Sequence, residues 1–153
     1  MKNFSNQCDE RQVIERGRAF QYGFLTLFAL MTLCFMLSSG FELHVFDDFT
    51  TYMFCTWPAI TVCFTMMIVR DAFDCINRSP GIALFSIYGL GGAFVIVSTV
   101  IEIVRGKAAI FAEGLIGHAA AELLCGFCCV LVCVVYWIHA AKRRKALKNA
   151  EKE

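Results

Sequence analysis

Four long apolar stretches fill most of this chain of 153 residues, and each is long enough to cross a bilayer. They cover residues 19–41, 49–69, 79–101 and, interrupted by His118 and Glu122, 114–138. The hydrocarbon core of a bilayer is about 30 Å thick, and a helix of about 20 residues crosses it. The stretches are continuous rather than alternating, which excludes the strands of a membrane barrel. The chain is therefore expected to fold in lipid.

The sequence predicts an all-α integral membrane protein with four helices in an up-and-down bundle. A single domain takes in residues 1–153, with spans at 19–40, 49–69, 80–101 and 118–139. A short amphipathic helix that runs straight into the first span is expected at residues 9–18, and residues 140–153 form a basic tail. Composition agrees, because only 18% of the residues are charged, against about 25% in soluble domains.

The distribution of basic residues predicts the orientation of the spans. Twelve of the fourteen lysines and arginines lie before the first span, between the second and third, or after the fourth. Because lysine and arginine concentrate on the cytoplasmic side, both termini are expected in the cytoplasm. The first span is expected to be retained, since its apolar stretch exceeds the 7–15 residues of a cleaved signal peptide.

Four of the nine cysteines lie in the fourth span, at Cys125, Cys128, Cys129 and Cys133. A Cys-x-x-Cys pair such as Cys125 and Cys128 can bind a metal or exchange disulfides. However, the predicted outer connections contain no cysteine, and no histidine adjoins the cluster. We favour the interpretation that these cysteines pack as small apolar residues, with a redox or metal role as the alternative. No metal, cofactor or catalytic residue is predicted.

Glu122 is the ionisable residue that lies in or beside the fourth span. Ionisable residues at membrane depth are costly and often functional, and small four-span exporters couple proton exchange to such a glutamate. Glu122, with His118 one turn before it, is therefore a candidate for proton coupling. The alternative is an interfacial position, because residues 123–138 form an uncharged stretch of their own and Trp137 and His139 suit an interface. We favour the interfacial position.

Local patterns predict further details. Arg11 and Glu15 are one turn apart and can pair. Pro58 is expected to kink the second span, and residues 107–121 are a candidate for a short interfacial helix. Small residues in the third span allow another helix to approach closely, in the same chain or in a dimer partner. These residues are Ser86, Gly89, Gly91, Gly92 and Ala93.

The N-terminal segment carries a family resemblance. Residues 9–12 read Asp-Glu-Arg-Gln, and residues 16–23 read Arg-Gly-Arg-Ala-Phe-Gln-Tyr-Gly and lead into the first span. This pattern resembles the start of a group of small, uncharacterised four-span membrane proteins of Gram-positive bacteria, mainly Firmicutes. The resemblance covers residues 9–30 and the four-span layout. It implies a bacterial plasma membrane and makes residues 9–12 a candidate docking element, but the group has no established activity to carry over.

We therefore predict a non-enzymatic interaction or accessory protein that spans the plasma membrane several times. The expected partners are the lipid bilayer, a second copy that meets the face of Gly89, Gly92 and Ala93, and an unidentified membrane or cytoplasmic protein. No nucleic acid is expected as a partner. The first alternative is a small proton-coupled transporter that uses Glu122, and the second is a membrane thiol redox protein.

Overall fold

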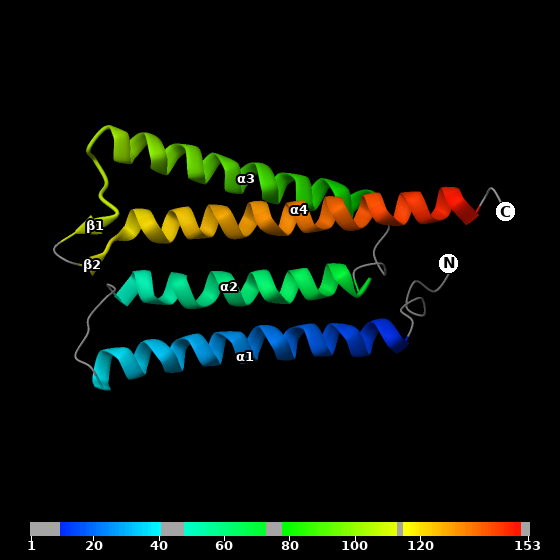
Figure 1. Cartoon of the computed structure of the whole chain (residues 1–153), viewed down its shortest axis with the longest axis horizontal. Coiled ribbons are helices and arrows are strands. Elements are labelled where there is room, and N and C mark those ends of the chain that lie inside the picture. The colour runs from blue at the N-terminus through cyan, green and yellow to red at the C-terminus, as the bar shows by residue number, and fades with distance from the viewer. Residues whose placement is uncertain (1–9, 41–47, 73–77, 113–114, 151–153) are drawn as a thin grey trace, which may run out of the picture.

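The computed structural model describes residues 10–40, 48–72, 78–112 and 115–150, and four long helices make up most of them (Figure 1). The helices are α1 (Glu10–Gly40), α2 (Asp48–Val69), α3 (Arg78–Val104) and α4 (His118–Ala150). All four are long and apolar enough to cross a membrane. The prediction of an all-α, four-helix membrane fold is confirmed.

The chain runs up and down, so that the start of α1 and the end of α4 lie at the same end of the molecule (Figure 1). This end is called the inner end below, following the prediction that the basic residues face the cytoplasm, and the opposite end is the outer end. The helix expected ahead of the first span runs directly into it, because α1 is continuous from Glu10 to Gly40. Likewise α4 continues through most of the basic tail to Ala150.

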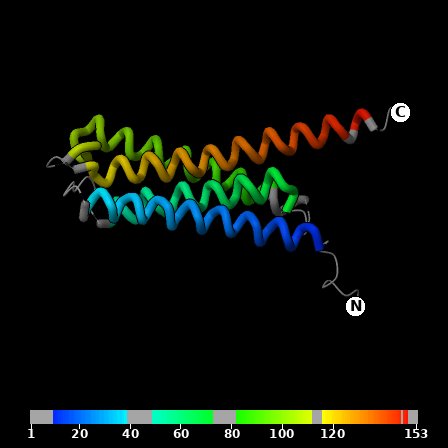
Figure 2. Tube along the Cα trace, turned by 60° about the horizontal axis from the view of Figure 1, so that its bottom comes forward, coloured from blue at the N-terminus to red at the C-terminus, as the bar shows by residue number. Residues whose placement is uncertain are grey.

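The helices are packed in the order α1, α2, α4, α3, which places α1 and α3 at the two edges. Figure 2 shows the same helices running side by side along the length of the molecule. Only 6% of the most apolar part of α1 is buried by the rest of the protein. Exposed apolar surface of this extent is unusual in a soluble monomer, and here lipid would cover it.

Small residues bring α3 and α4 together. A Cβ atom at Gly92 would lie 2.8 Å from the Gly126 carbonyl oxygen and 2.5 Å from the Cys129 Cβ, and one at Gly89 would lie 2.5 Å from the Cys133 Sγ. The close approach predicted for this face is therefore made by α4 of the same chain. Ala93 is exposed beside it. A homodimer stays a prediction, but while α3 and α4 are packed in this way Gly89 and Gly92 are not free to contact a second copy.

An aromatic cluster fills the space between α2, α3 and α4 in the inner half of the molecule. Phe85 of α3 stacks on Tyr136 of α4, with ring centroids 4.4 Å apart. The ring centroid of Phe64 in α2 lies 6.5 Å from that of Phe85 and 6.2 Å from that of Tyr88. Phe85 is only 2% exposed. This cluster closes the inner half of the space between the three helices.

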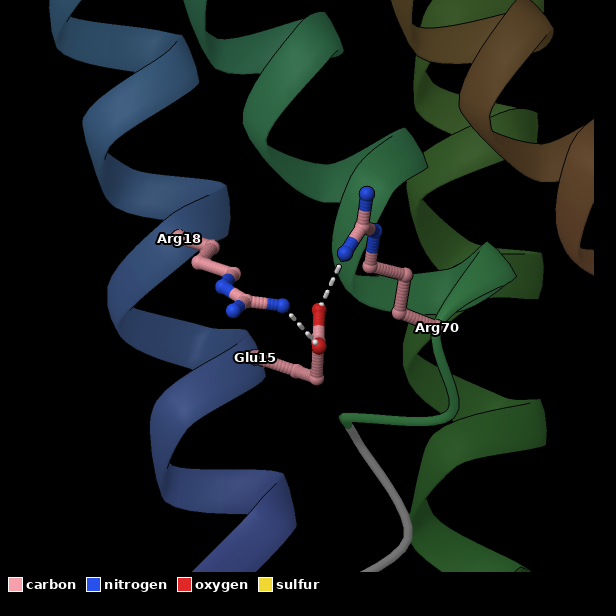
Figure 3. A network of polar contacts seen from close by, with 3 residues as sticks. All are labelled: Glu15, Arg18 and Arg70. Carbon is pink, nitrogen blue, oxygen red and sulfur yellow. Dashed lines mark hydrogen bonds and ion pairs between the residues drawn. The ribbon is translucent and has the colours of Figure 1, made fainter.

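Polar contacts hold α1 to α2 at the inner end (Figure 3). The Glu15 carboxylate of α1 accepts hydrogen bonds from Arg70, at 2.6 Å, and from Arg18, at 2.9 Å. The Nε of Arg16 donates to the Ala72 carbonyl oxygen at 2.7 Å, just beyond α2. Glu15 thus pairs with Arg18 and Arg70 rather than with Arg11, because the end of α2 brings Arg70 against this face of α1.

The turn after α2 and the segment between α3 and α4 both have regular backbone hydrogen bonding. Asp71 follows α2 with a φ of 56°. The hydrogen bonds from Asp71 N to Ile68 O and from Ala72 N to Met67 O form the turn that often ends a helix.

Between α3 and α4 the chain forms a short antiparallel hairpin, with β1 (Phe111–Ala112) paired to β2 (Leu115–Ile116). The expected interfacial helix at 107–121 is therefore wrong, and helix begins at His118.

Candidate functional site: a cleft at the outer end

A cleft of about 380 Å³ opens between α2, α3 and α4 in their outer halves. Its position follows from the packing below it, because the aromatic cluster that fills the inner half of the same space stops short of the outer end. The residues that line the cleft come from the first turns of α2 and α4 and from the last turns of α3. They are Phe49, Met53, Trp57, Val95, Ser98, Glu102, His118, Ala121, Glu122 and Cys125.

Glu122 lies one turn inside α4, and its carboxylate is anchored to α3. Its Oε2 is 2.8 Å from the Oγ1 of Thr99, and Thr99 is only 1% exposed. The same hydroxyl is 2.9 Å from the Val95 carbonyl oxygen. A threonine hydroxyl carries one proton and can rotate. It can therefore donate a hydrogen bond to an ionised Glu122, or donate to the Val95 carbonyl oxygen while accepting a hydrogen bond from a neutral Glu122.

A second carboxylate and a histidine share the cleft with Glu122. Glu102 lines it from the end of α3, and His118 lines it from the start of α4, on the same helix face as Glu122. The His118 ring stacks on Phe49 of α2, with centroids 4.6 Å apart. Among the described residues that line the cleft, none is lysine or arginine. When His118 is neutral, the two glutamates give the cleft a negative charge.

The wall on the side of α2 is aromatic and sulfur-rich. Phe49, Met53 and Trp57 follow one another on one face of this helix at spacings of four residues. The Trp57 indole Nε1 donates to the Met53 Sδ at 3.3 Å, which fixes the position of the indole. The helix continues through Pro58 without a break. A π face can attract a cation held near it, so this wall complements the carboxylates opposite.

Two of the cysteines predicted as candidates have different environments. Cys125 lines the cleft, whereas Cys128 is buried and does not. Farther along α4, Cys129 and Cys133 pack against the glycines of α3, as small apolar residues would. In the described part of the chain, no group of three or more His, Cys, Asp or Glu side chains could hold a metal ion.

The structure thus brings three of the four sequence-predicted candidates, Glu122, His118 and Cys125, into one cleft. The sequence does not mark Glu102, Thr99 or Trp57 as members of the site. Thr99 lies among apolar residues and no local pattern distinguishes it. The spacing of four residues between Phe49, Met53 and Trp57 was visible in the sequence, but it fits a lipid-facing stripe equally well.

Comparison with protein-family models, with curated proteins and with solved structures finds no match to this chain.

Proposed function

We propose that this protein is a non-enzymatic, multi-pass protein of the plasma membrane that binds a small organic cation in the outer cleft. The observation that carries the proposal is the pairing of two carboxylates, Glu102 and Glu122, with an aromatic wall that includes Phe49 and Trp57. A volume of about 380 Å³ is within the usual range for small-molecule sites.

The chemistry of the cleft favours a cation over an anion or a neutral ligand. Glu102 and Glu122 are exposed, and an ionised carboxylate attracts a cation and repels an anion. Thr99 supplies one hydrogen bond to Glu122, and a bound cation would supply the compensating charge. The apolar part of an organic cation would contact Phe49, Met53 and Trp57, whereas a small hydrated metal ion gains little from such a wall.

Binding can be tested with the Trp57 indole as the reporter. The chain has two tryptophans, so the Trp137→Phe variant leaves Trp57 as the only one. We expect tetraphenylphosphonium, added to this variant in detergent micelles, to change its fluorescence in a saturable way. Glu122→Gln should weaken binding about tenfold or more, which corresponds to about 1.4 kcal/mol, because it removes the charge and keeps the shape.

Glu10→Gln is the matched control, since Glu10 is an exposed carboxylate at the inner end of α1. It should leave the dissociation constant unchanged. The absence of saturable binding, or equal affinity in the Glu122→Gln variant, would rule out the proposed site.

A specific observation also supports proton-coupled transport as a second candidate function. The Thr99 hydroxyl can form a hydrogen bond with Glu122 in either protonation state, because the Val95 carbonyl oxygen, 2.9 Å from the hydroxyl oxygen, offers an alternative acceptor. A proton and a cation would then compete for the same carboxylate. In proteoliposomes, an imposed pH gradient should drive uptake of the cation, and Glu122→Gln should abolish it. Cation binding that persists without any proton-driven flux would leave the binding function and exclude transport.

A further inference from the structure

Two cysteines from different helices meet near the outer end of the molecule, outside the cleft. The Sγ of Cys34 in α1 lies 3.7 Å from the Sγ of Cys55 in α2. Both are free thiols, and Cys55 is 2% exposed whereas Cys34 is half-buried. Cys34 is six residues before the end of α1 and Cys55 seven residues after the start of α2. At a rise of about 1.5 Å per residue, both lie roughly 10 Å from the outer helix ends.

This pair differs from the cysteines of α4. A bond between two of Cys125, Cys128, Cys129 and Cys133 would join turns of a single helix. A bond between Cys34 and Cys55 would instead join two helices. A disulfide requires the sulfurs to approach to about 2.05 Å, and α1 can supply this movement because it is an edge helix that packs mainly on α2.

The bond would act at the opposite end of α1 from its ion pair with Arg70. In the described chain, the ion pairs between α1 and α2 involve Glu15 and Arg70 at the inner end. The Arg16 bond to Ala72 lies there as well. A covalent link at Cys34 would fix the outer end of α1 to α2, so that the helix is held at both ends.

We propose that Cys34 and Cys55 form a redox pair that a membrane-soluble quinone oxidises to a disulfide. Two S–H bonds break and one S–S bond forms. The two electrons and two protons pass to the quinone, which becomes the hydroquinone. Quinones partition into the bilayer, and they can reach Cys34 because α1 borders the lipid along most of its length. This site does not depend on the ligand of the cleft.

The sequence allows the linked pair to be identified directly. Residues 19–69 contain no lysine or arginine, so trypsin leaves Cys34 and Cys55 on one peptide. Cleavage after methionine separates them, because Met36 and Met53 lie between them. Membranes that contain the full-length protein would be treated with a short-chain benzoquinone, and free thiols would be blocked with N-ethylmaleimide. After cleavage, mass spectrometry without reductant would detect linked fragments.

We expect the fragment that ends at Met36 to be joined to residues 54–66 in the wild type, and the link to be lost in Cys34→Ala and Cys55→Ala. Cys63→Ala is the matched control, since Cys63 lies on the same fragment as Cys55 but packs against Gly23, and it should keep the link. Copper phenanthroline serves as a general oxidant. A link formed with copper phenanthroline but not with the quinone would overturn the proposal, and so would no link with either reagent.

Discussion

At the scale of single residues, Gly92 sets the distance between α3 and α4. Its neighbour Gly91 faces away, and a Cβ atom there would meet nothing within 4 Å. At Gly92 the same atom would lie 2.5 Å from the Cys129 Cβ and 2.8 Å from the Gly126 carbonyl oxygen. Backbone and Cβ atoms cannot move aside as the tip of a long side chain can. Two adjacent glycines of one helix therefore have opposite tolerance to substitution.

We predict that Gly92→Ala destabilises the protein by about 1–3 kcal/mol, because α3 must move away from α4 to accommodate the methyl group. Gly91→Ala should be neutral or stabilise by up to about 1 kcal/mol through helix propensity. Unfolding by denaturing detergent, followed by circular dichroism, measures both. Equal stability of the two variants would show that α3 and α4 do not pack through Gly92.

Asp71 illustrates a residue whose role depends on the tertiary contacts. It occupies the left-handed position at the end of α2, where glycine is usual. The corresponding position after α3 is Gly106, with a φ of 69°. The Asp71 carboxylate lies 3.4 Å from the Arg143 Nε and 3.7 Å from the His139 Nδ1 of α4. The contact with α4 gives a reason for aspartate here, where glycine would be less strained.

At the scale of elements, α1 is the helix held least by the rest of the protein. It packs mainly on α2, and its ion pair with α2 lies before the apolar stretch that begins at Ala19. The hydrogen bond and charge of Arg70, with a contribution from Arg18, hold the pKa of Glu15 below its ordinary value of 4.5. The contact therefore stabilises the folded protein when Glu15 is ionised.

We predict that Glu15→Gln lowers the melting temperature in detergent at pH 6–7. Because the folded-state pKa is below 4.5, the contribution of Glu15 is present above the pKa of the unfolded chain. It is lost as the pH falls through the folded-state value. The wild type and the variant should therefore converge in acid. Glu10→Gln, a matched change on the same helix, should show no such difference, and a gap that persists in acid would contradict the role of Glu15.

At the scale of the whole molecule, charge and packing divide the two ends into different environments. The inner end carries the basic part of α4, the pairs of Glu15 and Asp71, and the closed aromatic cluster. The outer end carries the cleft that Glu102, His118 and Glu122 line. If the basic residues face the cytoplasm, the cleft lies in the half of the protein nearer the outside and the aromatic cluster in the half nearer the cytoplasm.

We predict this orientation from charge, and labelling from each side tests it. Lys107 follows the outer end of α3 and Lys148 lies in the last turn of α4 at the inner end, and both are exposed. A membrane-impermeant maleimide should label the Lys107→Cys variant in intact cells and the Lys148→Cys variant only after permeabilisation, above the background of the wild type. The reverse pattern would place the cleft on the cytoplasmic side.

The sequence by itself determined that the helices are suited to lipid, how many helices there are, and that they alternate in direction. These follow from the length and apolarity of each stretch, which are local properties that a bilayer selects. It also marked Glu122, because a carboxylate near a span is rare enough to be noticed without a structure. The small residues of the third span predicted a close helix contact, because small side chains let two helices approach each other.

Only the tertiary structure decided which surfaces meet. Lipid is as apolar as the side chains that face it, so hydrophobicity does not show which face of a helix is buried. The order α1, α2, α4, α3, the contact between Thr99 and Glu122, and the pairing of Cys34 with Cys55 all depend on helix rotation and depth. These are set by packing between residues far apart in the chain. For that reason the cleft, the feature that carries the proposed function, became visible only in three dimensions.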